Sequence, residues 1–166
     1  MKYEFASIDE HNINDFTFTW LEVLQSMRGT KDLNTANQEI RTFKQTFLNH
    51  ITSQVKYDFY YYLRALKVDG RAVGFTAGII SFFESGVMLQ IGTFGITRYA
   101  RKKGYGRYFI NKIIEEMKKN KVNYVWLIPQ NEGFWNKQGF KVDTSGLIKR
   151  CYQMPYDDDT HYIKPY

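Results

Sequence analysis

Cysteine is nearly absent from this chain, since Cys151 is the only one in 166 residues. A lone cysteine can form neither an intramolecular disulfide nor a multi-cysteine metal site, and it suits a reducing compartment better than secretion. The sequence also lacks the run of about eighteen apolar residues that a membrane-spanning helix requires, and its start, MKYEFASIDEHN, contains no continuous apolar stretch. These absences predict a cytoplasmic protein without a membrane segment and without a metal site.

Proline occurs only three times, and the sequence contains no internal repeat, low-complexity segment or linker. Hydrophobic residues make up 43% of the chain and aromatic residues 17%, which is enough to bury a core and argues against disorder. We therefore predict a single domain over residues 1–166.

Acidic residues are missing from the stretch between Arg98 and Arg107, which holds five of the basic residues of a chain with net charge +6. A solvated basic loop is the simplest explanation of such a run, but here Gly104 and Gly106 alternate with the charges and an amphipathic helix follows. Glycines let backbone N–H groups turn outward, and a helix N-terminus adds positive potential. The stretch therefore predicts a binding loop for a phosphate-bearing cofactor.

Other anion-binding proteins fit the sequence less well. The remaining charge is scattered and no known nucleic-acid-binding motif occurs, which disfavours nucleic acid as a partner. Neither a Walker GxxxxGK motif nor a dinucleotide GxGxxG motif is present, because Gly104-x-Gly106 is followed by Phe109. Nucleotide hydrolysis and hydride transfer are disfavoured for the same reason.

Apolar periodicity predicts three long helices. The helix after the basic loop is the clearest, because apolar side chains recur every four residues from Tyr105 to Met117. An earlier helix is expected to begin at Asn14 or Asp15 and to end at Gly29. The helix after that one is expected to begin at the capping box Thr35-x-x-Gln38.

Runs of β-branched and aromatic residues predict the strands. Asp69-Gly70 is typical of a two-residue hairpin turn. Gly92 and Gly95 interrupt one strand, where glycine commonly marks a β-bulge or the close approach of another molecule. The strand at 122–128 follows a crossover helix and is expected to run parallel to its predecessor. The strands are expected at 2–7, 57–68, 71–83, 87–97, 122–128, 141–142 and 147–154, with a short helix at 134–138.

Two motifs flank the helix predicted from Tyr105 to Met117. Residues 101–106, RKKGYG, lie five residues after Ile96, and downstream Asn131 is followed by Phe134-Trp135 and then by Gly139-Phe140. In this order they resemble the GNAT superfamily of acyl-CoA-dependent N-acyltransferases. The phosphate loop of that family is Arg/Gln-x-x-Gly-x-Gly/Ala after an aliphatic strand residue, and its second element places an asparagine and an aromatic pair before Gly-Phe.

The resemblance implies an α/β (α+β) fold with a mixed, centrally splayed sheet flanked by helices, in the order β-α-α-β-β-β-α-β-α-β-β. It also implies that acetyl-CoA is the acyl donor. Its pantetheine arm is expected to pair with the backbone of one strand, and its thioester to lie between that strand and the strand at 122–128. The implied cofactor residues are Phe94, Gly95, Ile96, Arg101, Lys102, Lys103, Gly104, Tyr105, Gly106, Arg107, Asn131 and Trp135.

The catalytic residues stay unassigned. Direct transfer needs a neutral amine, and a lysine-like amine with a pKa of about 10.4 is almost entirely protonated at neutral pH. Glu84 is interpreted as a solvated turn residue, and His50 and His161 have no supporting local pattern. The strand at 87–97 has no acidic residue. A water relay is the alternative, with polar candidates at Tyr60, Tyr62, Gln90 and Thr93.

The group that protonates the leaving thiolate is equally open. The family often uses a tyrosine four residues before the glycine of Gly-Phe, but Trp135 stands there, and an indole donates a hydrogen bond rather than a proton. Trp135 is interpreted either as packing on the pantetheine arm or as a core aromatic beside Phe134. Cys151 is interpreted as inert packing in a late strand rather than as an acyl-carrying nucleophile. The acidic run at 157–159 is interpreted as a solvated tail.

The sequence therefore predicts an enzyme that moves an acetyl group from acetyl-CoA to a primary amine. An inactive acyl-CoA-binding or sensing protein of the same fold is the first alternative, and a basic nucleic-acid-binding protein the second. The acceptor has no diagnostic motif, and the oligomeric state, a homodimer included, is left open.

Overall fold

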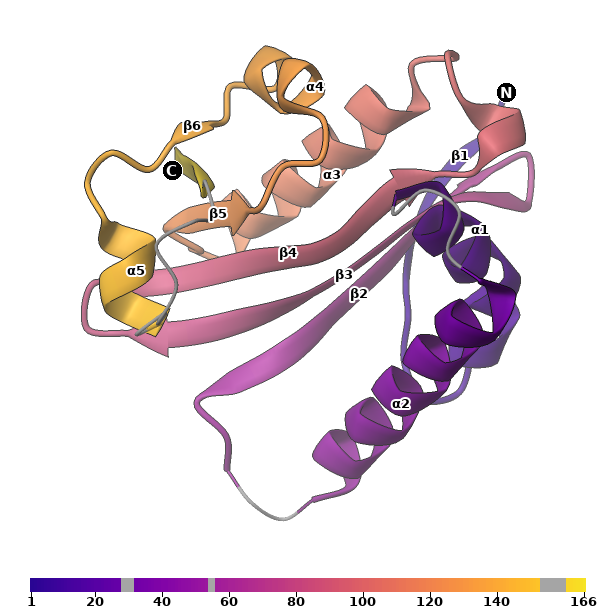
Figure 1. Ribbon diagram of the computed structural model, residues 1–166, viewed down its shortest axis with the longest axis horizontal. Coiled ribbons are helices and arrows are strands. Elements are labelled where there is room, and N and C mark those ends of the chain that lie inside the picture. Colours follow the sequence, from indigo (N-terminus) through magenta and orange to yellow (C-terminus); the bar gives the residue numbers. More distant parts are fainter. Residues whose placement is uncertain (28–31, 54–55, 153–160) are drawn as a thin grey trace.

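The computed structural model describes residues 1–27, 32–53, 56–152 and 161–166. Within these ranges seven strands form one open sheet in the order β1-β2-β3-β4-β5-β7-β6, in which only β4 and β5 pair in parallel (Figure 1). The strands are β1 (Tyr3–Ser7), β2 (Phe59–Val68), β3 (Arg71–Phe83), β4 (Gly86–Ile96), β5 (Tyr124–Leu127), β6 (Lys141–Val142) and β7 (Tyr162–Pro165).

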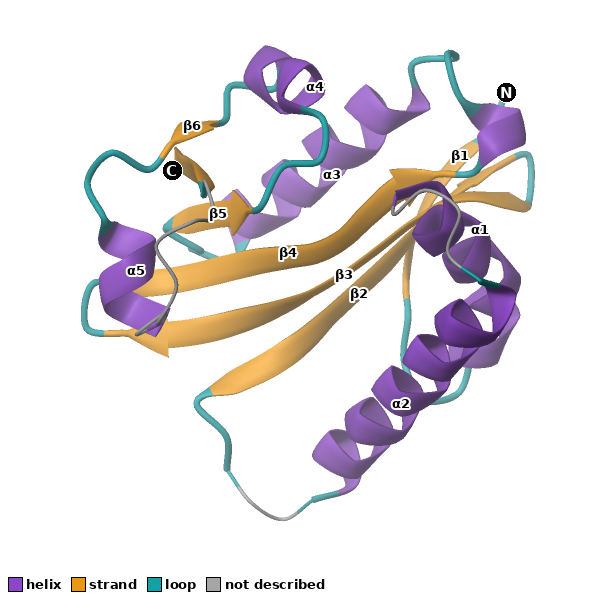
Figure 2. Cartoon of the chain, viewed as in Figure 1, coloured by secondary structure: helices purple, strands orange, loops and turns teal. Residues whose placement is uncertain are grey.

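Helices cover both faces of the sheet. They are the α-helices α1 (Thr17–Met27), α2 (Leu33–Thr52), α3 (Tyr105–Lys119), α4 (Glu132–Lys137) and α5 (Leu147–Tyr152), and the 3-10 turns η1 (Ile13–Phe16) and η2 (Arg98–Ala100). Phe109 and Met117 of α3 are buried in the core of one face. On the other face α1 and α2 cover β2 and β3, and α5 covers β4 and β5. Figure 2 shows α5 and the α1–α2 pair at opposite ends of the long strands.

The turn between β2 and β3 has the expected geometry. Asp69 and Gly70 both have positive φ, at 50° and 79°. A two-residue hairpin turn of this kind matches the right-handed twist of the strands it joins, and it favours Asp-Gly because glycine has no Cβ to clash. The predicted hairpin is therefore confirmed.

A β-bulge at Gly92 divides β4 into two halves. Ile91 and Thr93 lie opposite consecutive residues of β3, so Gly92 has no partner there. The extra residue reverses the faces that the following side chains occupy, because side chains alternate along a strand with a period of two. Ile91 and Phe94 consequently face the same α3 core although they are three residues apart. The prediction that a glycine marks a bulge in this strand is confirmed.

β4 and β5 separate at this bulge. Residues 88–91 pair with residues 124–127, and among the described strands the rest of β4 pairs with β3 alone. The parallel pairing follows from the crossover through α3, because a chain must cross the sheet to return in the same direction. The predicted parallel strand and the predicted splay are both confirmed.

Two predicted helix starts are wrong. α2 begins at Leu33, and its N-cap is Asp32, whose carboxylate accepts from the Asn34 N–H, so the box at Thr35 lies inside the helix. The earlier helical segment starts with η1 after Asn12, before the predicted cap. A sequence offers several capping residues within one turn, and the tertiary path of the chain decides among them. The predicted stop at Gly29 lies outside the described residues.

The last predicted strand is also wrong. Residues 147–152 form α5, and the closing strand is β7, which lies between β5 and β6. Asp143 Oδ2 accepts from the Ile148 N–H at 2.9 Å, a cap that favours helix in a short apolar run with no clear period. Cys151 is therefore half-buried on a helix, with its Sγ 3.1 Å from Ser85 Oγ. Residues 153–154 and the acidic run at 157–159 lie outside the described residues.

A bilayer could not be crossed by any helix of the described ranges, since none combines the necessary length and apolar character.

Candidate active site

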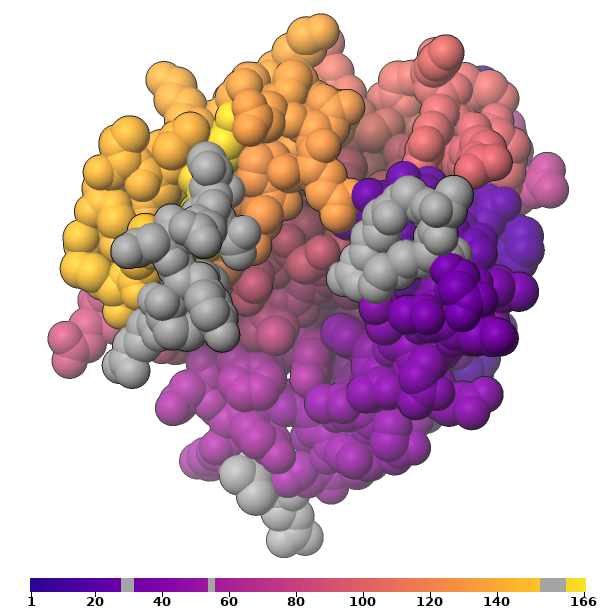
Figure 3. All heavy atoms as spheres, in the orientation of Figure 1, coloured from indigo at the N-terminus to yellow at the C-terminus, as the bar shows by residue number. Residues whose placement is uncertain are grey.

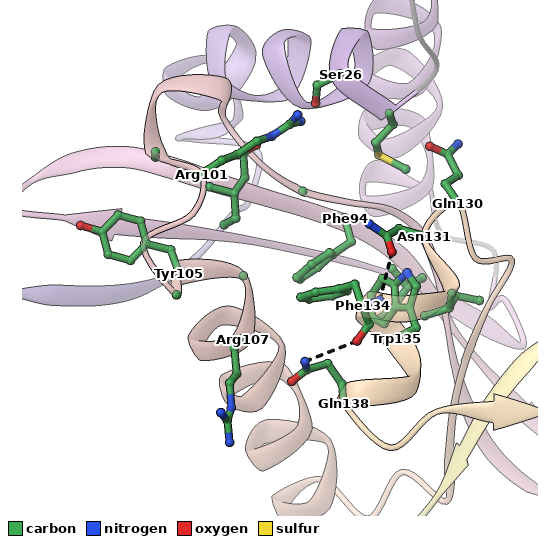
Figure 4. Close-up of a pocket in the computed structure, with 18 of the residues that line it drawn as sticks. Ser26, Phe94, Arg101, Tyr105, Arg107, Gln130, Asn131, Phe134, Trp135 and Gln138 are labelled. Atoms are coloured by element: carbon green, nitrogen blue, oxygen red, sulfur yellow. Dashed lines mark hydrogen bonds between the residues drawn. The ribbon is translucent and has the colours of Figure 1, made fainter.

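A cavity of about 720 Å³ lies where β4 and β5 separate. Its walls come from the end of α1, the second half of β4, the loop before α3, the end of β5 and α4 (Figure 4). All the predicted cofactor residues line this cavity except Lys103, which is exposed and does not line it. The lining residues that were not predicted as cofactor residues are Ser26, Met27, Ile91, Gly92, Ala100, Leu127, Ile128, Gln130, Phe134 and Gln138.

Residues 104–107, at the start of α3, line the cavity. Gly104 has φ +80°, a left-handed conformation that favours glycine, and it is the N-cap of α3 without a side-chain capping bond among the described residues. The first bond of the helix runs from the Tyr108 N–H to the Gly104 carbonyl, at 3.1 Å. The N–H groups of residues 105–107 therefore precede the helical ladder and carry the positive end of the helix dipole.

The charges around this loop have one sign. Arg101, Lys102 and Arg107 line the cavity, and none of the described acidic residues does. Arg101 Nε donates to the Ile96 carbonyl at 3.1 Å, which fixes the loop to the end of β4. Unpaired N–H groups at a helix N-terminus with cations beside them are features that favour the binding of an anion.

The free edge of β4 faces the same cavity. The Thr97 N–H donates to the Val73 carbonyl of β3 at 2.9 Å. Because backbone groups alternate in direction along a strand, those of Phe94 and Ile96 point away from β3. Arg101 uses the Ile96 carbonyl, so the Ile96 N–H and the backbone of Phe94 are the groups that an extended ligand can pair with.

Two glycines of the site lie where elements pack against each other. A Cβ on Gly95 would lie 2.7 Å from Val23 Cγ1 of α1, too close for any real side chain. At this glycine the close neighbour is α1 of the same chain, whereas the sequence suggested a bulge or another molecule. A Cβ on Gly106 would lie 3.4 Å from the Phe134 ring, so the start of α3 lies against α4 there.

α4 forms the wall opposite the loop. Asn131 is its N-cap and accepts from the Phe134 N–H at 3.0 Å, which commits the side-chain oxygen and leaves the amide nitrogen as a donor. Trp135 is 7% exposed, and its ring lies 5.1 Å from those of both Phe94 and Phe140. Trp135 is thus both a core aromatic and part of the cavity wall, and Figure 4 shows it beside Phe134 and Phe94.

The tyrosines considered for a water relay lie away from the cavity. The Tyr62 hydroxyl donates to Glu116 of α3 at 2.6 Å, and burial together with this carboxylate raises the pKa of Tyr62. Arg64 completes the cluster by pairing with Glu116. Tyr60 is 50% exposed and packs on Phe82. Neither hydroxyl is a cavity-lining group.

Glu84 and His50 also lie away from the cavity. Glu84 is exposed in the β3–β4 turn. His50 stacks on Tyr57 and Phe59, with ring centroids 4.2 and 4.9 Å away. No described Asp, Glu or His lines the cavity.

Both the sequence and the fold match known acetyltransferases. Residues 20–140 match the acetyltransferase (GNAT) family, whereas no curated protein matches the chain. The PaiA N-acetyltransferase of Thermoplasma acidophilum, in complex with coenzyme A, has a TM-score of 0.68 at 18% identity, with 100% of both chains covered. For Tetrahymena GCN5 the TM-score is 0.66 at 14% identity, with 100% of this chain and 98% of that chain covered. Arabidopsis thaliana Naa50, in complex with the bisubstrate analogue CoA-Ac-MVNAL, has a TM-score of 0.56 at 15% identity, with 100% of both chains covered.

Because the family match spans most of the chain, the protein belongs to the GNAT acetyltransferase family. The resemblance carried by the two motifs is therefore confirmed, and the mixed sheet agrees with the folds of these neighbours. The protein is an enzyme of the acyl-transferring class.

Proposed function

We propose that this enzyme transfers an acetyl group from acetyl-CoA to a primary amine by direct attack of the amine on the thioester. One observation carries the proposal: the N–H groups at the start of α3 and the unpaired edge of β4 face a single cavity. Coenzyme A has a diphosphate at one end and an extended amide-containing arm at the other. The start of α3 suits the diphosphate, and the unpaired edge of β4 suits the amide-containing arm.

The diphosphate would lie on the N–H groups of residues 105–107, with Arg101 and Arg107 nearby. Anions bind helix N-termini because the N–H groups are unpaired and the dipole is positive there. The pantetheine amides would pair with Phe94 and the Ile96 N–H as an added strand, and its apolar parts would contact Trp135. The thioester would then lie at the bulge, between Gly92 and Leu127.

Two neighbours support this arrangement by analogy. The Thermoplasma acidophilum PaiA enzyme was crystallised with coenzyme A, and Arabidopsis thaliana Naa50 with an analogue that joins coenzyme A to a peptide. A joined analogue is typical of a direct transfer, in which both substrates occupy the site together. Such a reaction needs no acylated side chain, and the half-buried position of Cys151 outside the cavity is consistent with that.

The proposal is tested by incubating the full chain with acetyl-CoA and a panel of amines while free thiol is monitored. The panel should contain amino-acid amides, short peptides, polyamines and aminoglycosides. Thiol release that depends on one amine, with a product heavier by one acetyl group in mass spectrometry, is the expected result. Binding of acetyl-CoA without turnover on any amine would instead identify a binding or sensing protein of this fold.

A further inference from the structure

Three buried polar atoms lie at or beside the indole of Trp126 and make no hydrogen bond of normal geometry among the described residues, although the Ser81 side chain lies near one of them, the Tyr152 hydroxyl. They are Trp126 Nε1, the Tyr152 hydroxyl and His161 Nε2. Buried polar atoms are paired in the great majority of cases, because an unpaired donor or acceptor loses its bonds to water without replacement. Three unpaired atoms around one ring indicate a site that binds a polar group.

The three side chains come from three different elements. Trp126 is on β5, Tyr152 is at the end of α5, and His161 directly precedes β7. The Tyr152 and His161 rings lie 4.9 and 5.4 Å from the indole, in edge-on arrangements. Trp126 is fully buried and His161 is 4% exposed, so both are held by packing.

This cluster adjoins the place proposed for the thioester. Leu127 pairs with Tyr162 at the last step of the antiparallel register of β5 and β7, and His161 directly precedes Tyr162. Opposed residues of such a pair have Cα atoms about 4.5–5.5 Å apart. Leu127 lines the cavity, so His161 lies one residue along the chain from the strand partner of a cavity-lining residue.

The cluster lies on the face opposite α3. Trp126 packs with Met88 and Ile148 beneath α5, whereas its neighbour Leu127 belongs to the α3 core. Between the α1–α2 layer and the C-terminal elements Figure 3 shows this face hollowed, with strand residues at the bottom of the hollow. An acceptor arriving there would meet the thioester from the side that the α3 loop does not occupy.

We propose, resting on the function proposed above, that these three side chains form the acceptor end of the active site, with His161 Nε2 as the base. An indole N–H and a tyrosine O–H are donors, and a neutral imidazole nitrogen is an acceptor. Their complement is a primary amine with an oxygen close to it, as in an amino-acid amide or a peptide N-terminus. Burial raises the pKa of Tyr152 and outweighs the opposite effect of the Trp126 and Ser81 side chains near its oxygen, so the hydroxyl stays protonated as a donor.

The proton balance of the step is as follows. The ammonium form of the acceptor gives one proton to His161 Nε2, and its nitrogen lone pair then attacks the thioester carbonyl carbon. As the C–N bond forms, the C–S bond breaks and its electron pair leaves on sulfur. The second amine proton passes to the thiolate, and the third stays on the product amide.

The first test compares His161→Gln with His11→Gln, a control at a side chain that is 85% exposed. Loss of a general base typically lowers the rate by about 100-fold or more. We expect that loss in kcat for His161→Gln, with the Kd for coenzyme A unchanged and His11→Gln equal to wild type. Added imidazole is expected to restore turnover in His161→Ala. Retention of kcat by His161→Gln, or a loss in His161→Ala that imidazole does not relieve, would overturn the base assignment.

The second test uses leucinamide and isopentylamine, which carry similar apolar chains with and without a carbonyl beside the amine. The measured quantity is kcat/KM for leucinamide divided by kcat/KM for isopentylamine. This ratio is compared between wild type and Tyr152→Phe, so that the different basicities of the two amines cancel. One lost hydrogen bond is expected to lower this ratio by about tenfold. An unchanged ratio would refute the oxygen-binding role. If wild type releases no thiol with any amine, the proposed function itself fails before the variants are compared.

Discussion

Substitution of Gly104 by glutamate is the sharpest test of the phosphate loop. A Cβ at this position would meet no atom within 4 Å, so a longer side chain fits without a clash. Its cost to stability is the left-handed backbone, about 1–2 kcal/mol for a residue with a Cβ. We therefore expect Gly104→Glu and the matched control Gly104→Gln to fold with the same small loss.

The two variants should differ in their affinity for coenzyme A. A carboxylate about 6 Å from one phosphate charge is repelled by about 3 kcal/mol at an effective dielectric constant of about 20. Since about 1.4 kcal/mol corresponds to a tenfold change, Gly104→Glu should bind about 100-fold more weakly than Gly104→Gln. The amide variant carries the same backbone strain and similar volume, so the difference between the two isolates the charge.

Isothermal titration calorimetry with coenzyme A at two salt concentrations measures this difference. Exposed charges are screened over about 10 Å at 0.1 M salt and about 3 Å at 1 M, so the gap between the variants should narrow as salt rises. Equal affinities of the glutamate and glutamine variants at low salt would show that the phosphates do not lie at this loop. The assignment of residues 101–107 would then be wrong.

Three further outcomes follow from individual contacts. Gly95→Leu should lower the free energy of urea unfolding by about 1–3 kcal/mol, because its Cβ would lie 2.7 Å from Val23 Cγ1, and adding Val23→Ala should recover part of the loss. Burial disfavours ionisation of Asp143, but hydrogen bonds at the start of α5 outweigh it and hold the pKa of Asp143 below its usual value. A group whose pKa is lowered in the folded state stabilises the protein at pH values above its unfolded pKa, here about 3.9. The free energy of unfolding of wild type should therefore exceed that of Asp143→Asn by about 1 kcal/mol at neutral pH, and this difference should vanish as pH falls through the folded-state pKa. A gap independent of pH would contradict this account. Arg107→Ala should weaken coenzyme A binding more than Lys103→Ala, because of the two residues only Arg107 lines the cavity, and equal Kd values would count against the cavity as the binding site.

The parts of the site that could be predicted from sequence depend on local interactions. Gly104 and Gly106 stand where a helix begins, and the four-residue period from Tyr105 onward defines which face of α3 is buried. The Asp69-Gly70 turn is equally local, since its two φ values belong to adjacent residues. Such features depend on a few neighbouring side chains, so their pattern along the chain is enough to recognise them.

Other predictions were wrong at places where alternative secondary structures or alternative capping residues have similar energies. The run at 147–152 is apolar enough for a strand or a helix, and the cap from Asp143 favours the helix. The start of α2 moved from Thr35 to Leu33 because Asp32, two residues earlier, supplies an equally good cap. The local sequence limits which element can form and where a helix can begin, but tertiary contacts decide between the alternatives.

The glycine-containing loop at 101–107, the helix behind it and the family can all be recognised from the amino-acid sequence, because each depends on residues close together along the chain. Only the tertiary structure decided what surrounds them. The bulge at Gly92 reverses the faces of β4 and ends its pairing with β5, and the register of β7 brings His161 to Trp126 and Tyr152. Pairing between distant segments depends on register and side-chain packing, and a shift of one residue would move each of these side chains to the other face of the sheet.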